Sequence, residues 1–278
     1  MNPSIPAASH ANSVMSTIPP AKVSIRNVSL RYFTSASETE ALSDISIEIP
    51  TGEFVSIIGQ SGCGKSTLLS LIAGVLMPTG GEVLVDGRPV RGPNPKIGYM
   101  LQQDYLFEWR TILENAILGA EVQGTDLEKA KARAVQLLTR YGLGKFLKHL
   151  PRQLSGGMRQ RVALVRTLCT EPDIVLLDEP FSALDSQTRI ALADEVADIL
   201  RREGKTTILV THDIAEAVSM TDRVIVLSRR PGQVKSDHRI EFVGKDNSRP
   251  SPFGARNAPE FNGYFNRLWQ ELEVHVEG

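Results

Sequence analysis

The segment from Gly59 to Thr67 constrains this chain more than any other part of its sequence, because it is rich in glycine and ends in Lys-Ser-Thr. An apolar run, residues 54–58, precedes it, and a second, largely apolar run, residues 68–73, follows it. This pattern predicts a strand, a loop and a helix in succession, which is the context that a phosphate-binding loop requires. A chance glycine-rich turn would lack the flanking strand and helix.

The chemistry expected of this loop is the binding of a nucleotide's phosphates. Glycines let the backbone curl so that successive N–H groups face a polyphosphate, and the helix N-terminus adds partial positive charge. Lys65 can reach the β- and γ-phosphates, and the Ser66 hydroxyl can ligate Mg²⁺. The candidate nucleotide-binding residues of the loop are Gly59, Gln60, Ser61, Gly62, Cys63, Gly64, Lys65, Ser66 and Thr67.

A second candidate anion site is the sequence Leu-Ser-Gly-Gly-Met at residues 154–158. Ser155 can cap a helix that starts near Met158, and it offers a hydroxyl to a phosphate while Gly156 and Gly157 offer N–H groups. Taken alone, this segment could be an ordinary turn before a helix. The residues that follow it favour a phosphate site.

Two adjacent carboxylates, Asp178 and Glu179, follow the apolar run of residues 174–177. Such a run predicts a central parallel strand that is buried on both faces, and open α/β sheets bind ligands at the carboxyl ends of their strands. Asp178 is therefore a candidate Mg²⁺ ligand, acting through water, and Glu179 is a candidate general base for the attacking water. A helix-capping acidic turn is the alternative interpretation of either acid alone.

These segments, in this order, resemble the ATP-binding cassette (ABC) family of ATPases from about Val23 to Arg239. Residues 154–158 are similar to the family's signature motif, although the wider family most often has glutamine where this chain has Met158. The resemblance implies an α/β fold: a P-loop NTPase core of ABC type with an N-terminal antiparallel β subdomain and an inserted helical subdomain. It also implies hydrolysis of ATP with Mg²⁺.

The resemblance implies roles for four further residues. Asp185 lies in a segment similar to the loop that crosses a dimer interface, and it could also cap the following helix. His212 resembles the switch histidine that contacts the γ-phosphate, although a lone histidine after a strand is more often structural. Gln102 resembles the glutamine that senses Mg²⁺ and the membrane partner, with Gln103 left open as the alternative. Tyr32 matches the aromatic residue that stacks on adenine, and is otherwise an ordinary strand residue.

Two stretches, residues 99–111 and 227–233, are similar to importer ATPases of the nitrate/sulfonate/taurine class. This similarity implies three partners: a second ATPase subunit, expected to be a second copy of this chain arranged head to tail, integral membrane permease subunits, and a solute-binding protein. The permease is expected to dock between Gln102 and Trp109. The chain would then be cytoplasmic, on the inner face of the cell membrane. The similarity identifies a class of importer and not its solute.

Four large apolar residues within five positions, Tyr105, Leu106, Phe107 and Trp109, cannot all face one core. Exposed apolar clusters mark partner sites, and aromatic residues are common anchors of interfaces. We therefore expect these four residues to line a cleft for a short cytoplasmic helix of the permease. Burial inside the helical subdomain is the alternative for any one of them.

Composition and periodicity divide the chain into residues 1–21, 22–240 and 241–278. The first part is rich in Ser, Ala, Pro and Asn, which predicts a disordered tail. The second is the ABC domain, and its residues 103–170 are expected to be largely helical. The third is an extension in which residues 243–259 predict a loop and residues 261–276 predict an amphipathic helix.

Charge and cysteine content bear on the partners and the location of the chain. A net charge of −1 over 278 residues favours neither nucleic acid nor an anionic membrane surface as a partner. No apolar run is long enough to span a bilayer, and no secretion signal is present, which suits the cytoplasm. The two cysteines provide no disulfide framework.

Cys63 carries an expectation of its own, because it lies in a glycine loop before a helix N-terminus. That position tends to lower the pKa of a thiol. We therefore expect Cys63 to react with maleimides when the site is empty and to be shielded by bound ATP. Burial would instead make it inert.

Two other classes of phosphate-loop protein remain as alternatives. A soluble ABC ATPase acting mechanically on DNA would need a long coiled coil between Lys65 and Leu154, where no sustained heptads occur. One that acts on ribosomes usually carries two cassettes, and one is found here. A small-molecule kinase would leave residues 154–158 unexplained. An importer ATPase is therefore the favoured function.

Overall fold

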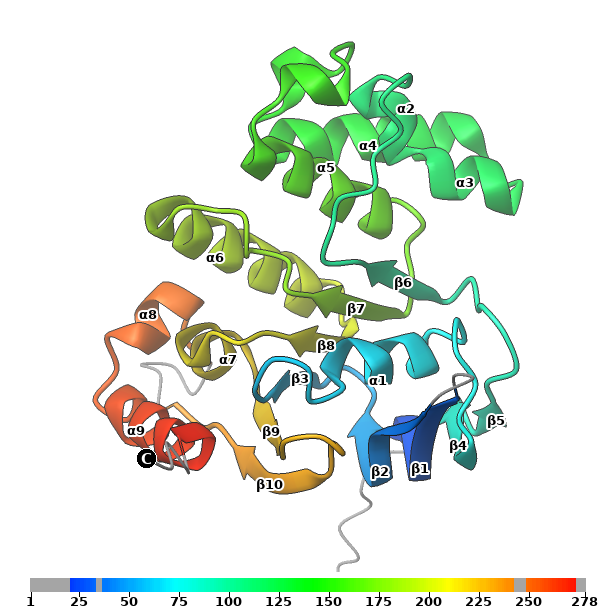
Figure 1. The fold of residues 1–278 in the computed structure, drawn as a ribbon. Helices are drawn as coiled ribbons and strands as arrows, with labels where there is room; N and C mark the ends of the chain where they lie inside the picture. Colours follow the sequence, from blue (N-terminus) through cyan, green and yellow to red (C-terminus); the bar gives the residue numbers. More distant parts are fainter. Residues whose placement is uncertain (1–20, 34–36, 243–248, 274–278) are drawn as a thin grey trace, which may run out of the picture.

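Two β-sheets form the framework of the described part of the chain, which is residues 21–33, 37–242 and 249–273 of a computed structural model (Figure 1). The first is antiparallel, with the strand order β2 (Glu38–Pro50), β1 (Ala21–Phe33), β4 (Gly80–Val85) and β5 (Arg88–Pro89). The second has the order β10 (Val234–Arg239), β9 (Arg223–Leu227), β3 (Phe54–Ile58), β8 (Thr206–Val210), β7 (Ile174–Asp178) and β6 (Ile97–Met100). All its neighbours are parallel except β9 and β10.

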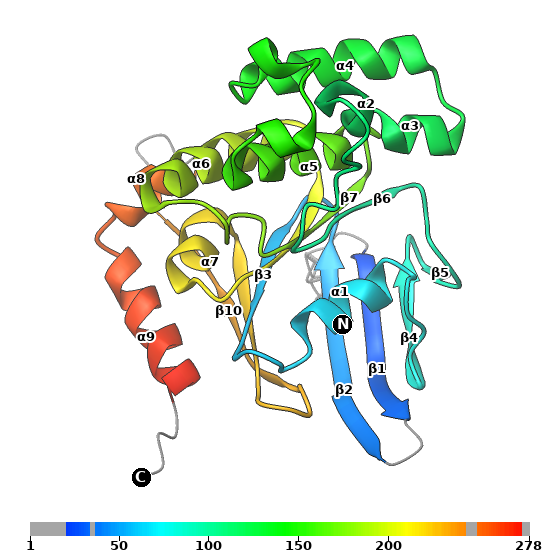
Figure 2. The same ribbon diagram turned by 45° about the horizontal axis from the view of Figure 1, so that its top comes forward.

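Helices surround the sheets, and one group of them lies apart at one end of the molecule, beyond β6 and β7 (Figures 1 and 2). This helical group contains α2 (Ile112–Ala116), α3 (Leu118–Gln123), α4 (Leu127–Arg140) and α5 (Gly156–Leu168), with short 3₁₀ turns at Gly144–Phe146 and Pro151–Gln153. The other helices are α1 (Lys65–Ile72), α6 (Ser186–Arg202), α7 (Ile214–Met220), α8 (Pro252–Arg256) and α9 (Phe261–Glu273). None of the helices in the described ranges is long and apolar enough to cross a membrane.

The parallel sheet lies between two hydrophobic cores, and successive side chains along its central strands face one core and then the other. In β7, Leu176 faces the core that contains α1 and the antiparallel sheet. Its neighbours Val175 and Leu177 face the core formed with the helical group and α6, as alternation along a strand requires. Because all five residues of β7 are buried, the strand is apolar on both faces, which is what the sequence pattern predicts. A third, smaller core joins α7 and α9 to β9.

The antiparallel sheet before a parallel core confirms the α/β fold class. The helix expected to start near Met158 begins at Gly156 and is capped by Ser155, as predicted. One local prediction is wrong. The segment expected to be a loop up to residue 259 contains α8, because the Ser251 hydroxyl accepts from the Gly254 N–H at 3.2 Å and Pro252 suits a first helical turn. Ala21 begins β1. The rest of the predicted tail, and the last residues of the predicted C-terminal helix, lie outside the described residues.

Candidate functional site

The glycine-rich loop connects β3 to α1, as the sequence predicts. Gly64 precedes α1 with a φ of 102°, and Gly62 has a φ of 76°, a region in which side chains are strained. Space is also limited at Gly64, where a Cβ atom would lie 2.6 Å from Cδ2 of Leu42 and 3.0 Å from the carbonyl oxygen of Ala41. The path of the loop therefore requires glycine, and β2 supports it from behind.

Lys65 is buried, and its ammonium group turns back onto the loop. Nζ donates to the carbonyl oxygens of Gly59 at 2.8 Å and of Gln60 at 3.0 Å. Hydrogen bonds between two charged groups are stronger than those to neutral carbonyls. A phosphate within reach would therefore compete well for the donors of Lys65.

The Ser66 hydroxyl, at the start of α1, meets the carboxylate at the end of β7. Its Oγ donates to Oδ1 of Asp178 at 3.0 Å. Burial raises the pKa of Asp178, while the hydrogen bond from Ser66 opposes that rise. A hydroxyl and a carboxylate oxygen are the donors that Mg²⁺ prefers, and this ion takes few ligands from the protein itself. The pair therefore fits a magnesium ion at the phosphates.

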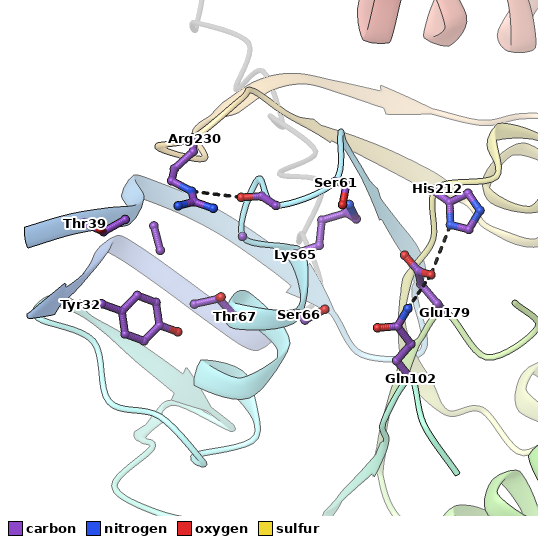
Figure 3. Close-up of a pocket in the computed structure, with 13 residues that line it drawn as sticks. Tyr32, Thr39, Ser61, Lys65, Ser66, Thr67, Gln102, Glu179, His212 and Arg230 are labelled. Atoms are coloured by element: carbon purple, nitrogen blue, oxygen red, sulfur yellow. Dashed lines mark hydrogen bonds and ion pairs between the residues drawn. The ribbon is translucent and has the colours of Figure 1, made fainter. Parts of the chain in front are cut away.

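Three polar side chains lie close together on the side of the phosphate loop away from Tyr32: those of Glu179, Gln102 and His212 (Figure 3). Gln102 donates from Nε2 to Oε2 of Glu179 at 3.1 Å, and Nδ1 of His212 lies 3.3 Å from the same oxygen. The backbone of Glu179 has a φ of 47°, and its N–H donates to the carbonyl oxygen of Val210 at 2.9 Å. Three of the four candidate catalytic residues thus meet at the carboxyl ends of β6, β7 and β8, and Lys65 is the fourth.

The loop and this polar cluster line one pocket of about 660 Å³. Its lining consists of Tyr32, Thr39, Ala41, Ser61, Gly62, Gly64, Lys65, Ser66, Thr67, Gln102, Glu179, His212 and Arg230. Sequence reasoning assigned no role to Thr39 or Arg230. Nothing in a single sequence distinguishes Thr39 from other strand residues. Arg230, in contrast, belongs to the importer-like stretch of residues 227–233, which could have drawn attention to it.

Three residues of the loop, Gly59, Gln60 and Cys63, do not line this pocket. The Gln60 side chain points away from it: Nε2 donates to the carbonyl oxygen of Leu272 at 3.0 Å, and Oε1 accepts from Nε of Arg229 at 2.8 Å. The end of α9 therefore holds the loop from outside.

The structure favours burial, the alternative interpretation, over an exposed thiol of lowered pKa at Cys63. The residue is only 1% exposed, and it packs into the core shared by α1 and the two sheets. Burial raises the pKa of its thiol, and the nearby charge of Lys65 and the backbone hydrogen bonds only partly oppose this. Tertiary packing thus outweighs the effect of the helix N-terminus.

We now expect Cys63 to resist maleimide at pH 7.5, with or without ATP, because its raised pKa leaves little thiolate and its burial blocks access. Cys169 should behave in the same way, since burial raises its pKa to about 11. Mass spectrometry after brief alkylation should show two unmodified cysteines in the folded protein and two modified ones in urea. Rapid labelling of Cys63 that ATP prevents would restore the exposed-thiol interpretation.

A second pocket, of about 340 Å³, contains the signature-like segment. Ser155 caps α5 by accepting from the N–H of Met158 at 3.4 Å, and Asp185 caps α6 by accepting from the N–H of Thr188 at 3.0 Å. The lining residues are Ser155, Gly156, Gly157, Met158, Arg161, Ala183, Leu184, Asp185 and Thr188. None of them lines the first pocket. The structure therefore joins Asp185 to the signature segment and leaves both apart from the phosphate loop.

The large apolar residues after Gln102 are divided between surface and core. Tyr105 is 58% and Trp109 is 75% exposed, and Trp109 stacks on the part-buried Phe107 with ring centroids 4.8 Å apart. Leu106 is buried in the core of the helical group, so its expected place on a surface cleft is wrong. Three aromatic residues of the segment remain available to a partner.

Comparison with known proteins agrees with the family resemblance of the sequence over most of the chain. Residues 42–182 match the family described as ABC transporter. The chain is 46% identical to an uncharacterized ABC transporter ATP-binding protein, YtlC, of Bacillus subtilis, over 89% of this chain and 94% of that protein. It is 37% identical to the taurine import ATP-binding protein TauB of Roseobacter denitrificans, over 92% of this chain and 97% of that protein.

One solved structure with a similar fold contains ADP and Pi, the products of ATP hydrolysis. The dimeric post-hydrolysis state of the ATP-binding cassette MJ0796, bound to ADP and Pi, matches with a TM-score of 0.72 at 35% identity, covering 79% of this chain and 99% of that one. The phosphate loop, the two carboxylates at the end of β7 and the separate signature pocket all fit this relationship. The chain therefore belongs to the ATP-binding cassette family and is an ATPase subunit that binds ATP.

Proposed function

We propose that this chain is the ATP-hydrolysing subunit of an importer of the nitrate/sulfonate/taurine class, working at the inner face of the cell membrane. Two copies would pair head to tail, with permease subunits and a solute-binding protein completing the system. Taurine import ATP-binding proteins of three bacteria are 37–41% identical to this chain. That relationship supports the class and leaves the solute open.

The proposed pairing of two copies rests on the separation of the two pockets. ATP in the first pocket of one copy, with Tyr32 against its adenine, would be covered by Ser155, Gly156 and Gly157 of the other. The loop that contains Asp185 would cross the interface. The similar MJ0796 cassette is dimeric with ADP and Pi bound, which supports pairing of two copies. The γ-phosphate would hold the two copies together, and its removal would let them separate.

The chemistry proposed for the first pocket is an in-line attack of water on the γ-phosphorus. The bond to the bridging oxygen breaks, ADP leaves, and Glu179 accepts the proton of the attacking water. Lys65 and His212 bind the γ-phosphate and offset the charge that grows in the transition state. Mg²⁺, held by Ser66, by Asp178 through water and by Gln102, would supply further positive charge at the phosphates.

The observation that best supports coupling to a permease is the attachment of the exposed aromatic segment to α5. Arg159 of α5 pairs with Asp104, with Nε 2.9 Å from Oδ2, and Arg166 donates to the carbonyl oxygens of Asp104 and Tyr105 at 2.7 and 2.9 Å. The same helix begins at the signature segment. A partner bound at Tyr105 and Trp109 would therefore be connected to the part of the chain that must approach ATP.

Docking at this segment predicts the behaviour of the double variant Tyr105→Ala, Trp109→Ala. Both side chains are largely exposed, so the isolated variant should keep the ATP affinity and the melting temperature of the wild type. Assembly with the permease subunits that co-purify with the wild-type chain should fail, because the aromatic anchors of the interface are lost. Affinity purification from native membranes measures this directly.

The matched control is Trp269→Ala on α9, which also removes an exposed tryptophan (46% exposed) and should assemble normally. Unfolding of the double variant would show that these two side chains stabilise the fold, and would contradict their role as free anchors for a partner. Normal assembly and transport would place the docking site elsewhere. Co-purification of the wild type with ribosomes or DNA, rather than with a membrane protein, would favour a mechanical factor over an importer.

A further inference from the structure

The turn between β9 and β10 packs against the phosphate loop, although the two lie far apart in the sequence. Gly232 accepts from the N–H of Ser43 at 3.0 Å and donates to the carbonyl oxygen of Ala41 at 2.9 Å. A Cβ atom at Gly232 would lie 2.2 Å from the carbonyl oxygen of Cys63, so only glycine fits there. The turn is therefore fixed against both β2 and the loop, and it contributes Arg230 to the lining of the nucleotide pocket.

Arg230 extends from this turn into the pocket. Its Nε donates weakly to the carbonyl oxygen of Gly62 at 3.4 Å, and it lines the pocket with Tyr32 and Thr39. Figure 3 shows the guanidinium on the side of Thr39, remote from Glu179. It thus lies at the end of the pocket away from the groups proposed to attack the γ-phosphate.

The charge of Arg230 is not balanced by a carboxylate among the described residues. Several arginines of the fold pair with a carboxylate, such as Arg159 with Asp104 and Arg201 with Asp222 at 2.8 Å, whereas Arg230 is exposed at the pocket and has no such partner among the described residues. An arginine side chain offers five donors in a plane that suits phosphate oxygens, and bonds between charged partners are the strong ones. A free guanidinium at the rim of a phosphate site therefore has an anion as its natural partner.

We infer that Arg230 is a further nucleotide-binding residue, which donates to the part of the nucleotide that ATP and ADP share, the α-phosphate and the ribose. Its position opposite Glu179 means that it contributes to affinity and not to cleavage of the terminal phosphate. The inference concerns the isolated chain and does not depend on pairing with a second copy or with a permease.

The test compares Arg230→Ala with Arg230→Lys in the full-length chain. Arg230→Ala should weaken the binding of both ATP and ADP about tenfold, the usual cost of one hydrogen bond to a charged group. The KM for ATP should rise by a similar factor, while kcat should change less than twofold. Lysine should restore part of the affinity because it keeps the charge. Calorimetry with ATP and with ADP, together with steady-state kinetics, gives each quantity.

Arg267→Ala, which removes an exposed arginine of α9, is the control and should bind both nucleotides normally. Unchanged affinity of Arg230→Ala for ADP would overturn the inference. So would a fall in kcat without a rise in KM, which would move Arg230 into the catalytic step. A lower melting temperature in both Arg230 variants, with normal ADP affinity, would also overturn it and reduce Arg230 to a support of the turn.

Discussion

Glu179→Gln should bind ATP with wild-type affinity and hydrolyse it about 10²–10⁴ times more slowly, the usual cost of losing a general base. Glutamine has nearly the same shape as glutamate and can still contact Gln102 and His212, which lie 3.1 and 3.3 Å from Oε2 of Glu179. It cannot accept a proton from water. Initial rates of phosphate release, with ATP affinity from calorimetry, measure the two effects separately.

The same variant should also pair in the presence of ATP, because an uncleaved γ-phosphate would keep the two copies together. Size-exclusion chromatography with ATP and without Mg²⁺ should show a dimer that ATP induces. Glu128→Gln, which alters an exposed carboxylate of α4 paired with Lys131, is the control and should behave as the wild type. Turnover of Glu179→Gln at the wild-type rate would remove Glu179 from the role of base.

The second large effect is expected from Gly156→Asp, at a residue that lines the signature pocket. A Cβ atom at Gly156 would meet nothing within 4 Å, and an acidic residue in the first turn of α5 suits the helix dipole. The variant should therefore fold and bind ATP at the phosphate loop normally. Its ATPase rate should fall by a factor on the order of 10² or more, because like charges brought together at an interface cost several kcal/mol.

Gly156→Ala separates the effect of charge from that of size. It fills the same open space without a carboxylate, so it should retain most of the ATPase activity. Gly157 would be a poor choice for this test, since a Cβ atom there would lie 2.5 Å from Cδ2 of Leu184. Wild-type hydrolysis by Gly156→Asp would show that the signature pocket does not approach the γ-phosphate, and would contradict head-to-tail pairing.

Local patterns allowed the sequence to predict the phosphate loop and the strand that ends at Asp178. Glycine spacing and a short apolar run are properties of neighbouring residues, and they determine how the chain turns and which strand is buried. The resemblance of these segments, in their order, to the ABC family then predicted the antiparallel sheet before the parallel core.

Contacts between distant segments could not be predicted in this way. Arg230 reaches Gly62 across 168 positions, and Gln60 reaches Leu272 across 212, so no local pattern indicates either contact. Cys63 shows the same limit, because the core that covers it raises its pKa more than the start of the following helix lowers it. The exposure of Tyr105 and the burial of Leu106 also depend on how the segment lies against α5.

The separation of the two pockets has a consequence for genetics. Since the pockets have no lining residue in common, two alleles with different defects, one at Lys65 and one at Gly156, could complement each other in one cell. In a head-to-tail pair of one copy of each variant, both defects would lie in the same ATP site. The other ATP site would be intact. A chain that carries both changes would instead inactivate both ATP sites of any pair that it forms with a wild-type chain. Such an allele would therefore be dominant over the wild type.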